Sequence, residues 1–137
     1  MNKLFKLFVT TTCLLVLISC AEKNPPRDEI PLIKNLLGQF EKAVREHNPA
    51  GIDSLIIAEA YEQGYHSTKI LGDIFGLNNA GDFIKFGSRE FSYTKDIGFV
   101  KCLIVSDTTD AGFQDRPVEI VVIKKYDQWF LKQFDLK

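Results

Sequence analysis

The segment Tyr61-Glu62-Gln63-Gly64-Tyr65-His66 holds the densest group of polar and aromatic side chains in this sequence. Histidine titrates near neutral pH, so His66 beside a carboxylate of Asp73 or Asp82 would form a general acid/base pair. Nothing in the spacing ties these side chains together, and an exposed loop with two surface tyrosines is the favoured interpretation. We therefore assign no catalytic residue. The candidate ligand-binding residues of this segment are Tyr61, Tyr65 and His66.

A second candidate group is aromatic and consists of Phe91, Tyr93 and Trp129. If these three residues share the concave face of one sheet, they would line an apolar pocket suited to a small hydrophobic ligand. Packing in the core is the simpler interpretation, because aromatic residues make up 12% of the chain and most of them must fill its interior. The direction in which these rings point decides between the two interpretations.

Cysteine and histidine are too few and too scattered for metal or disulfide chemistry. Of the three cysteines, Cys13 lies in the apolar N-terminal segment, and Cys102 lies in the apolar run from Val100 to Val105. A structural zinc site needs four ligands at close spacing, whereas His47 and His66 share no motif with Cys102. We expect Cys102 to be a small buried hydrophobe, and we expect no metal and no cofactor.

The first 19 residues have the layout of an export signal. Lys3 and Lys6 precede an apolar run from Leu7 to Ile18, interrupted only by threonines. A transmembrane helix needs about 20 apolar residues, and this run is shorter and ends at polar sequence. Residues 1–19 are therefore predicted to be a signal peptide that is removed.

The end of this segment, Leu17-Ile18-Ser19-Cys20, resembles the bacterial lipobox at all four positions. The resemblance implies that a diacylglycerol is attached to the Cys20 sulfur and that the chain is cut before this residue. It also implies that the new amino terminus is usually acylated. More than one acyl chain is needed for stable attachment, because a single chain binds a bilayer only marginally. Residue 21 is alanine and not aspartate, which by resemblance to the enterobacterial sorting rule favours the outer membrane over the inner. The implied partner is a lipid bilayer of the bacterial envelope.

The composition limits the size and charge of the protein that follows the predicted anchor. Removal of residues 1–19 from the 137-residue chain leaves 118 residues, the size of one domain, and changes the formal charge from −1 to −3. Residues 20–30, which include Pro25-Pro26, are predicted to be a flexible tether, and residues 31–137 a single domain. Interspersed charges without a basic cluster argue against nucleic acid as a partner.

Helical periodicity dominates the first half of the domain. Apolar residues from Leu32 to Val44 recur at helical spacing, with Pro31 in the first turn. Asn48 and Pro49 favour the start of a second helix, because asparagine caps and proline fits the first helical position. The predicted buried stripe of this second helix consists of Ile52, Leu55, Ile56 and Ala60. Two further short helices are predicted over Thr68–Phe75 and Ala80–Phe86.

After Gly87 the apolar period shifts toward two, which is typical of strands. The predicted strands are Glu90–Lys95, Ile97–Ser106, Pro117–Lys125 and Gln128–Leu136. Turn-forming residues from Asp107 to Gly112 separate the second and third strands, and the short link between the last two predicts an antiparallel hairpin. Helices followed by an antiparallel meander predict an α+β fold, with the helices packed on one face of a sheet of about four strands.

This order of elements resembles the nuclear transport factor 2-like superfamily. Residues 36–55, LLGQFEKAVREHNPAGIDSL, look like its opening helix, polar break and second helix, and residues 120–131, IVVIKKYDQWFL, look like its closing hairpin. The resemblance implies a cone-shaped α+β fold with a curved antiparallel sheet and a cavity. Some members are isomerases or dehydratases that use an aspartate, tyrosine or histidine in that cavity. None of their catalytic motifs matches this sequence residue by residue, so no role is carried over.

Three functions remain as hypotheses. The leading one is a membrane-anchored envelope lipoprotein whose domain binds a small molecule or an envelope protein without catalysis. An enzyme of the isomerase or dehydratase type, using His66 and a nearby aspartate, is the alternative. The third is an inhibitory or immunity-type module that binds protein through an exposed sheet face, which could also form a homodimer and predicts a contiguous apolar patch.

Overall fold

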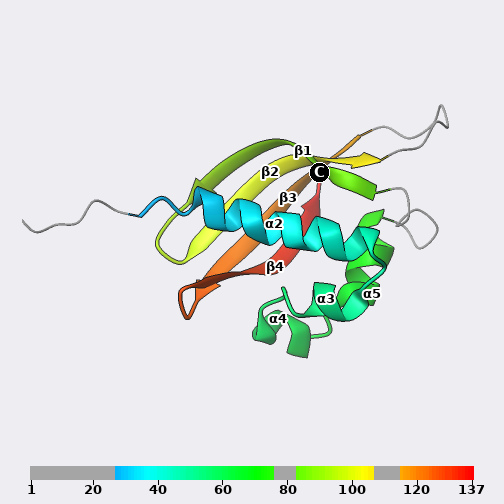
Figure 1. Cartoon of the computed structure of the whole chain (residues 1–137), viewed down its shortest axis with the longest axis horizontal. Helices are drawn as coiled ribbons and strands as arrows, with labels where there is room; N and C mark the ends of the chain where they lie inside the picture. Colours follow the sequence, from blue (N-terminus) through cyan, green and yellow to red (C-terminus); the bar gives the residue numbers. More distant parts are fainter. Residues whose placement is uncertain (1–26, 76–82, 107–114) are drawn as a thin grey trace, which may run out of the picture.

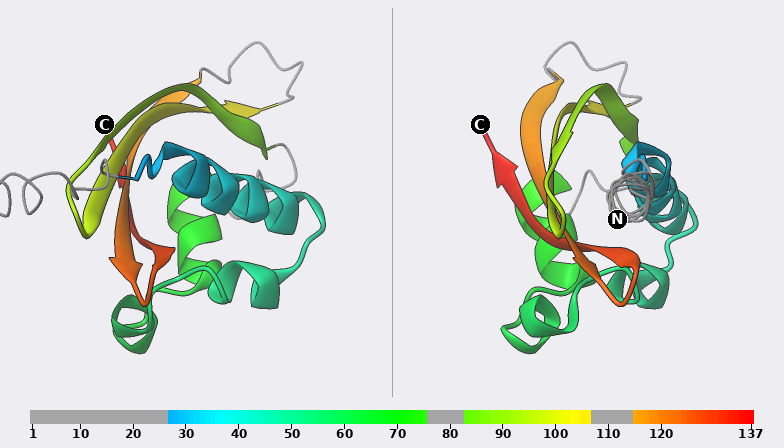
Figure 2. Two further views of the ribbon diagram at one scale, coloured as in Figure 1. Left: turned by 60° about the vertical axis from the view of Figure 1, so that its left-hand side comes forward. Right: turned by 90° about the vertical axis from the view of Figure 1, so that its left-hand side faces the viewer.

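The computed structural model describes residues 27–75, 83–106 and 115–137 and shows an α+β fold (Figure 1). Its sheet has four antiparallel strands in sequence order. They are β1 (Phe83–Tyr93), β2 (Ile97–Ser106), β3 (Arg116–Lys125) and β4 (Gln128–Leu136). The sheet curves around helix α2 (Ile30–Arg45), which lies across its concave face (Figures 1 and 2). The predicted fold class and the helix-on-one-face arrangement are thus confirmed.

Helix α2 is amphipathic, and its apolar stripe is the one expected from the sequence. Pro31 stands in the first turn, where its missing N–H costs no hydrogen bond. Ile33, Leu37 and Phe40 are fully buried against the sheet, whereas Lys34 and Lys42 are exposed. The helix ends in a Schellman motif, in which the Asn48 N–H donates to the Ala43 carbonyl over 2.9 Å.

Three phenylalanines fill the space between α2 and the sheet. The Phe40 ring lies 5.7 Å from that of Phe86 and 5.2 Å from that of Phe134, and the latter two are 6.1 Å apart. Inward-facing residues of β2 and β3, including Val100 and Ile120, are completely buried beneath them. The centre of the domain is therefore a packed aromatic core.

The predicted second helix is wrong in its second half. Helix α3 (Pro49–Asp53) begins as expected, with the Asn48 side chain accepting from the Gly51 N–H over 2.9 Å. The chain then becomes extended, and Ile56 pairs in parallel with Leu131 of β4 before helix α4 (Ala58–Glu62) begins. The backbone of residues 55–57 forms hydrogen bonds with the free edge of β4. Local periodicity does not reveal this interaction, because its partner is distant in the sequence.

The next two predicted helices have opposite outcomes. Helix α5 (Ser67–Ile70) continues into a π-helical turn, η1 (Leu71–Phe75), which confirms helical structure over Thr68–Phe75. The helix predicted over Ala80–Phe86 is wrong from residue 83 onward, because Phe83 begins β1; residues 80–82 lie outside the described residues. Phe86 pairs with Ile104 of β2 and is buried, so tertiary pairing overrides the local pattern.

All four predicted strands are present, and the first is longer than expected. Strand β1 extends back to Phe83 through an irregularity between Gly87 and Glu90, where Ser88 adopts a φ of 48°. The predicted turn between the second and third strands, residues 107–112, lies outside the described residues. Within the described ranges, no helix combines the length and the apolar character that crossing a bilayer requires.

Two glycines provide opposite tests of this packing. A Cβ on Gly98 of β2 would lie 2.9 Å from Val122 Cγ2 and 3.4 Å from Ile33 Cδ1, whereas one on Gly38 of α2 would meet nothing within 4 Å. We expect Gly98→Ala to lower the free energy of unfolding by about 1–3 kcal/mol through overpacking. Gly38→Ala should raise it by about 1 kcal/mol because alanine favours the helix. Urea unfolding measures both, and a Gly98→Ala variant as stable as the parent would contradict the described close packing of Val122 and Ile33 around Gly98.

Candidate binding cleft

An open cleft of about 710 Å³ lies where α4, α5 and η1 meet β4. Its apolar lining consists of Ile57, Ala60, Tyr65, Ile123 and Phe134. Its polar lining consists of Glu59, Gln63, Lys69, Asp73, Lys132 and Gln133. We call this site the Tyr65 cleft. Its volume falls within the range of sites that take small molecules, and its lining joins five apolar or aromatic residues to six polar ones.

A helix end places Tyr65 in this cleft. Helix α4 ends in a Schellman motif, in which the Gly64 N–H donates to the Tyr61 carbonyl and the Tyr65 N–H to the Ala60 carbonyl, both over 3.0 Å. Gly64 has a φ of 89°, a conformation that glycine adopts without steric cost. The chain therefore reverses at Gly64 and directs the half-buried Tyr65 toward β4.

The Tyr65 hydroxyl satisfies a backbone N–H of the edge strand β4. It accepts a hydrogen bond from the backbone N–H of Phe134 over 2.9 Å. Burial raises the pKa of Tyr65 to about 12, so the phenol stays protonated at neutral pH. Its own proton therefore makes Tyr65 a hydrogen-bond donor in the cleft, and the raised pKa argues against a role as a base.

A β-bulge next to Tyr65 supplies the positive charge of the cleft. Val121 pairs with Gln133 and Val122 with Leu131, so Lys132 is the extra residue on β4. The three other charged groups of the lining are paired: Lys69 forms an ion pair with Asp73 over 2.8 Å, and Glu59 pairs with Lys125 outside the lining. Within the described chain Lys132 forms no such pair, and its side chain is exposed. The uncompensated charge of the lining is thus positive.

The predicted acid/base pair is not assembled in the described residues. His66 is half-buried, and its ring packs edge-on against Tyr61 at 5.0 Å between centroids. The Asp73 carboxylate pairs with Lys69, and no hydrogen bond or ion pair joins it to His66. Asp82 lies outside the described residues. Neither Tyr61 nor His66 lines the Tyr65 cleft, so of the three candidates from this segment only Tyr65 does.

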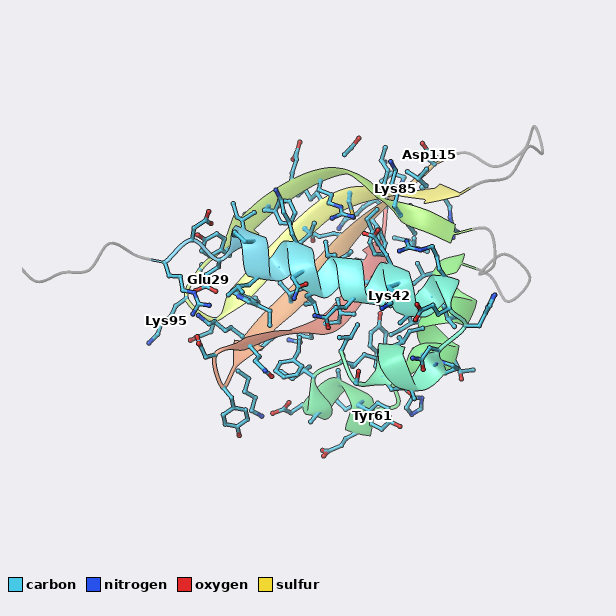
Figure 3. All side chains as sticks on the ribbon, in the orientation of Figure 1. Glu29, Lys42, Tyr61, Lys85, Lys95 and Asp115 are labelled. Carbon is cyan, nitrogen blue, oxygen red and sulfur yellow. The ribbon has the colours of Figure 1, made fainter. Side chains whose placement is uncertain are left out.

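Two of the aromatic candidates, Tyr93 and Trp129, meet at Glu29, a residue that the sequence did not single out. Glu29 is 7% exposed, and it accepts hydrogen bonds from Lys124 Nζ and from the Trp129 indole N–H, each over 2.8 Å. The Glu29 backbone N–H donates to the Tyr93 hydroxyl over 3.4 Å. The hydrogen bonds from Lys124 and Trp129 hold the pKa of Glu29 below its usual value. Figure 3 shows Glu29 at the start of α2.

Glu29, Tyr93, Lys124 and Trp129 form a group that we call the Glu29 cluster. It shows that the folded part begins earlier than predicted. Glu29 belongs to the stretch expected to be a flexible tether, yet α2 begins at Ile30 and Arg27 bonds Asp127 over 3.2 Å. The domain therefore begins before residue 31. Sequence patterns do not reveal such contacts, because they join residues about 100 positions apart.

The strand register places all three aromatic candidates on the concave face, as the pocket hypothesis required. Phe91 pairs with Val100 and Tyr93 with Gly98, both inward-facing positions. They meet α2 there: Phe91 packs on the core beneath Lys34 Nζ, which is 5.6 Å from its ring centroid. Trp129 also lines a second cleft, of about 380 Å³, between α2 and β4. Tyr93 and Trp129 thus meet at Glu29, whereas Phe91 packs beneath Lys34.

The remaining polar and sulfur groups serve packing. Cys102 is 5% exposed, and burial raises the pKa of its thiol to about 12, as befits a buried hydrophobe. Glu41 bonds Arg89, which also donates to the Phe86 carbonyl. Among the described residues, no three histidine, cysteine, aspartate or glutamate side chains gather so as to hold a metal ion.

In comparisons with protein-family models, with curated proteins and with solved structures, none matches this chain. The function proposed below therefore rests on the sequence and the geometry of the chain itself.

The Glu29 cluster predicts a pH dependence. Because its folded-state pKa lies below the usual 4.5, ionised Glu29 contributes stability that is complete above about pH 4.5 and is lost as pH falls through the folded pKa. We expect Glu29→Gln to lower the free energy of unfolding at neutral pH and the deficit to shrink in acid. Urea unfolding across this pH range measures the effect. Glu46→Gln, which removes an exposed carboxylate at the other end of α2, is the control; a deficit that does not vary with pH would refute the assignment.

Proposed function

We propose that this chain is a lipid-anchored domain of the bacterial envelope that binds a small amphipathic molecule in the Tyr65 cleft. One observation carries the binding role: within about 710 Å³ the cleft joins an apolar wall, the protonated phenol of Tyr65 and the ammonium of Lys132, which forms no ion pair within the described residues. The anchor rests on the lipobox-like Leu17-Ile18-Ser19-Cys20, and the alanine at position 21 favours the outer membrane.

The lining defines the chemistry of the ligand. Ile57, Ile123 and Phe134 offer apolar surface for the body of the molecule. The Lys132 ammonium offers a charge-assisted hydrogen bond to an acidic group, and Tyr65 can donate to an oxygen acceptor. The expected ligand is therefore a small molecule with an apolar body and one acidic group.

Binding accounts for the cleft better than catalysis does. A general base needs a group that loses its proton near neutral pH within reach of the substrate. Tyr65, with a pKa of about 12, keeps its proton, and Asp73 is engaged by Lys69. His66, the only other candidate of the alternative hypothesis in the described residues, does not line the cleft. An isomerase or dehydratase is therefore not our proposal.

We further propose that the domain is a divergent relative of the nuclear transport factor 2-like superfamily. Support comes from the long opening helix across a curved antiparallel meander with a closing hairpin that carries Trp129. The departure is the interior, where Phe40, Phe86 and Phe134 occupy the space in which the superfamily usually has its cavity. Binding at the open Tyr65 cleft is consistent with such a filled interior.

The cleft can be tested with anilinonaphthalene sulfonate, a probe with an apolar ring system and an acidic group. We expect saturable fluorescence enhancement with the folded mature protein. Ala60→Trp should abolish it by filling the cleft, and Lys132→Gln should weaken binding roughly tenfold through the loss of one charged hydrogen bond.

The control for this test lies on the same helix. Ala58 is exposed and lies outside the cleft lining, so Ala58→Trp adds the same ring at a neutral position. Circular dichroism establishes that each variant is folded. Equal binding by the Ala60→Trp and Ala58→Trp variants would place the probe elsewhere and overturn the proposed site.

The anchor is tested by Cys20→Ala in the full chain. We expect the parent protein to partition with membranes and to carry the mass of its acyl chains, because two or more chains give stable attachment. The variant should lose the added mass and appear in the soluble fraction. Unchanged mass and partitioning would defeat the lipoprotein assignment.

A further inference from the structure

Two turns and the start of the described chain meet at one end of the molecule. The β1–β2 turn and the β3–β4 turn are tied together because the Lys124 N–H donates to the Asp96 carbonyl over 2.8 Å. Arg27 joins them through its 3.2 Å ion pair with Asp127. Figure 1 shows both turns at the end where α2 begins, and Figure 3 labels Glu29 and Lys95 there. We call this the turn end.

An aromatic ring projects from the turn end. Tyr126 is 86% exposed, the largest exposure among the large hydrophobic side chains of the described residues. Tyr126 and Asp127 have φ values of 53° and 61°, at turn positions that favour glycine or asparagine. A tyrosine adopts this left-handed backbone conformation at some steric cost. Its ring, with Lys125 Nζ 5.5 Å from the centroid, combines an apolar body with polar surroundings.

The covalent link to the anchor limits where this end can be. Seven peptide units separate Cys20 from Arg27, and a fully extended chain of that length spans at most about 25 Å. The Arg27–Asp127 pair places the end of that link next to Tyr126. By contrast, the far end of α2, near Glu46, lies 16 helical residues further on, about 24 Å away. With the lipid that we propose on Cys20, the turn end is therefore the part of the domain that is held within about 25 Å of it.

The charges of the turn end are balanced. Its four cationic side chains are Arg27, Lys95, Lys124 and Lys125, and its four anionic ones are Asp28, Glu29, Asp96 and Asp127. Among them, Arg27 pairs with Asp127 and Lys124 with Glu29. Lys95 and Asp96 are adjacent and opposite in sign. A surface without excess charge is neither repelled by a zwitterionic bilayer nor dependent on anionic lipid.

We propose that the turn end rests on the bilayer surface, with Tyr126 at the level of the lipid headgroups, so that the domain stands on its two turns. Tyrosine is enriched at membrane–water interfaces because its ring is amphipathic. This orientation rests on the proposed anchor at Cys20. It leaves the far end of α2 directed away from the membrane.

The test uses mature lipidated protein in phosphatidylcholine vesicles that contain a nitroxide-labelled phospholipid as a quencher. Single fluorophores are attached through Tyr126→Cys, Lys95→Cys or Glu46→Cys; the buried Cys102 is shielded from the reagent. We expect probes at positions 126 and 95 to be quenched several-fold more than the probe at 46. Neither high salt nor added anionic lipid should change this ratio.

Flotation of the same samples separates the two proposals. If the protein floats with the vesicles and all three probes are quenched equally, or the probe at 46 most, the orientation is wrong and the anchor stands. If the lipidated parent protein does not float, the anchor fails, and the orientation fails with it. The probe at 95 keeps the test decisive if the Tyr126→Cys variant distorts its own turn.

Discussion

The Glu29 carboxylate accepts hydrogen bonds from Lys124 and from the Trp129 indole, and through them the first described residues of the chain are joined to the last hairpin. A carboxylate that is 7% exposed is stable only while its partners satisfy it. Because Glu29 stands immediately before α2, these bonds fix where the helix starts on the sheet and therefore how its apolar stripe meets the core. The same cluster sets where the preceding chain leaves the domain, so this one contact bears on the packing, on the proposed tether and on the proposed orientation at a membrane.

The cleft depends on how the free edge of β4 is covered. An exposed strand edge invites pairing with other chains, and here two devices occupy it. The Leu55 carbonyl and the Ile57 N–H bond the backbone of Leu131, and then the Tyr65 hydroxyl takes the N–H of Phe134. Between these two contacts lies the bulge at Lys132. Beyond the bulge, the side chain of Tyr65 covers the edge in place of a further strand. The space beside that side chain is the Tyr65 cleft.

Local patterns predicted the parts of the fold that local forces decide. The amphipathic stripe of α2, the cap formed by Asn48 and the period of the four strands were sufficient to derive an α+β fold with helices on one face. Predictions were wrong where a distant partner determines the local structure. Ile56 was predicted to be helical but pairs with Leu131, and Phe86 was predicted to be helical but pairs with Ile104 of β2. Tyr65 was recognised by its residue type. Glu29 and Lys132 were not, because a contact with Trp129 across the chain and a one-residue bulge leave no signal in hydrophobic periodicity.

The Glu29 cluster can be observed directly by hydrogen exchange of the Trp129 indole proton, followed by nuclear magnetic resonance. A proton donated to a buried carboxylate opens only with the structure around it, so its exchange should be as slow as that of core amides such as Val100 and Ile120. Its resonance should also shift in acid as Glu29 takes up a proton. Exchange as fast as that of the exposed turn at Tyr126, with no response to acid, would contradict the account.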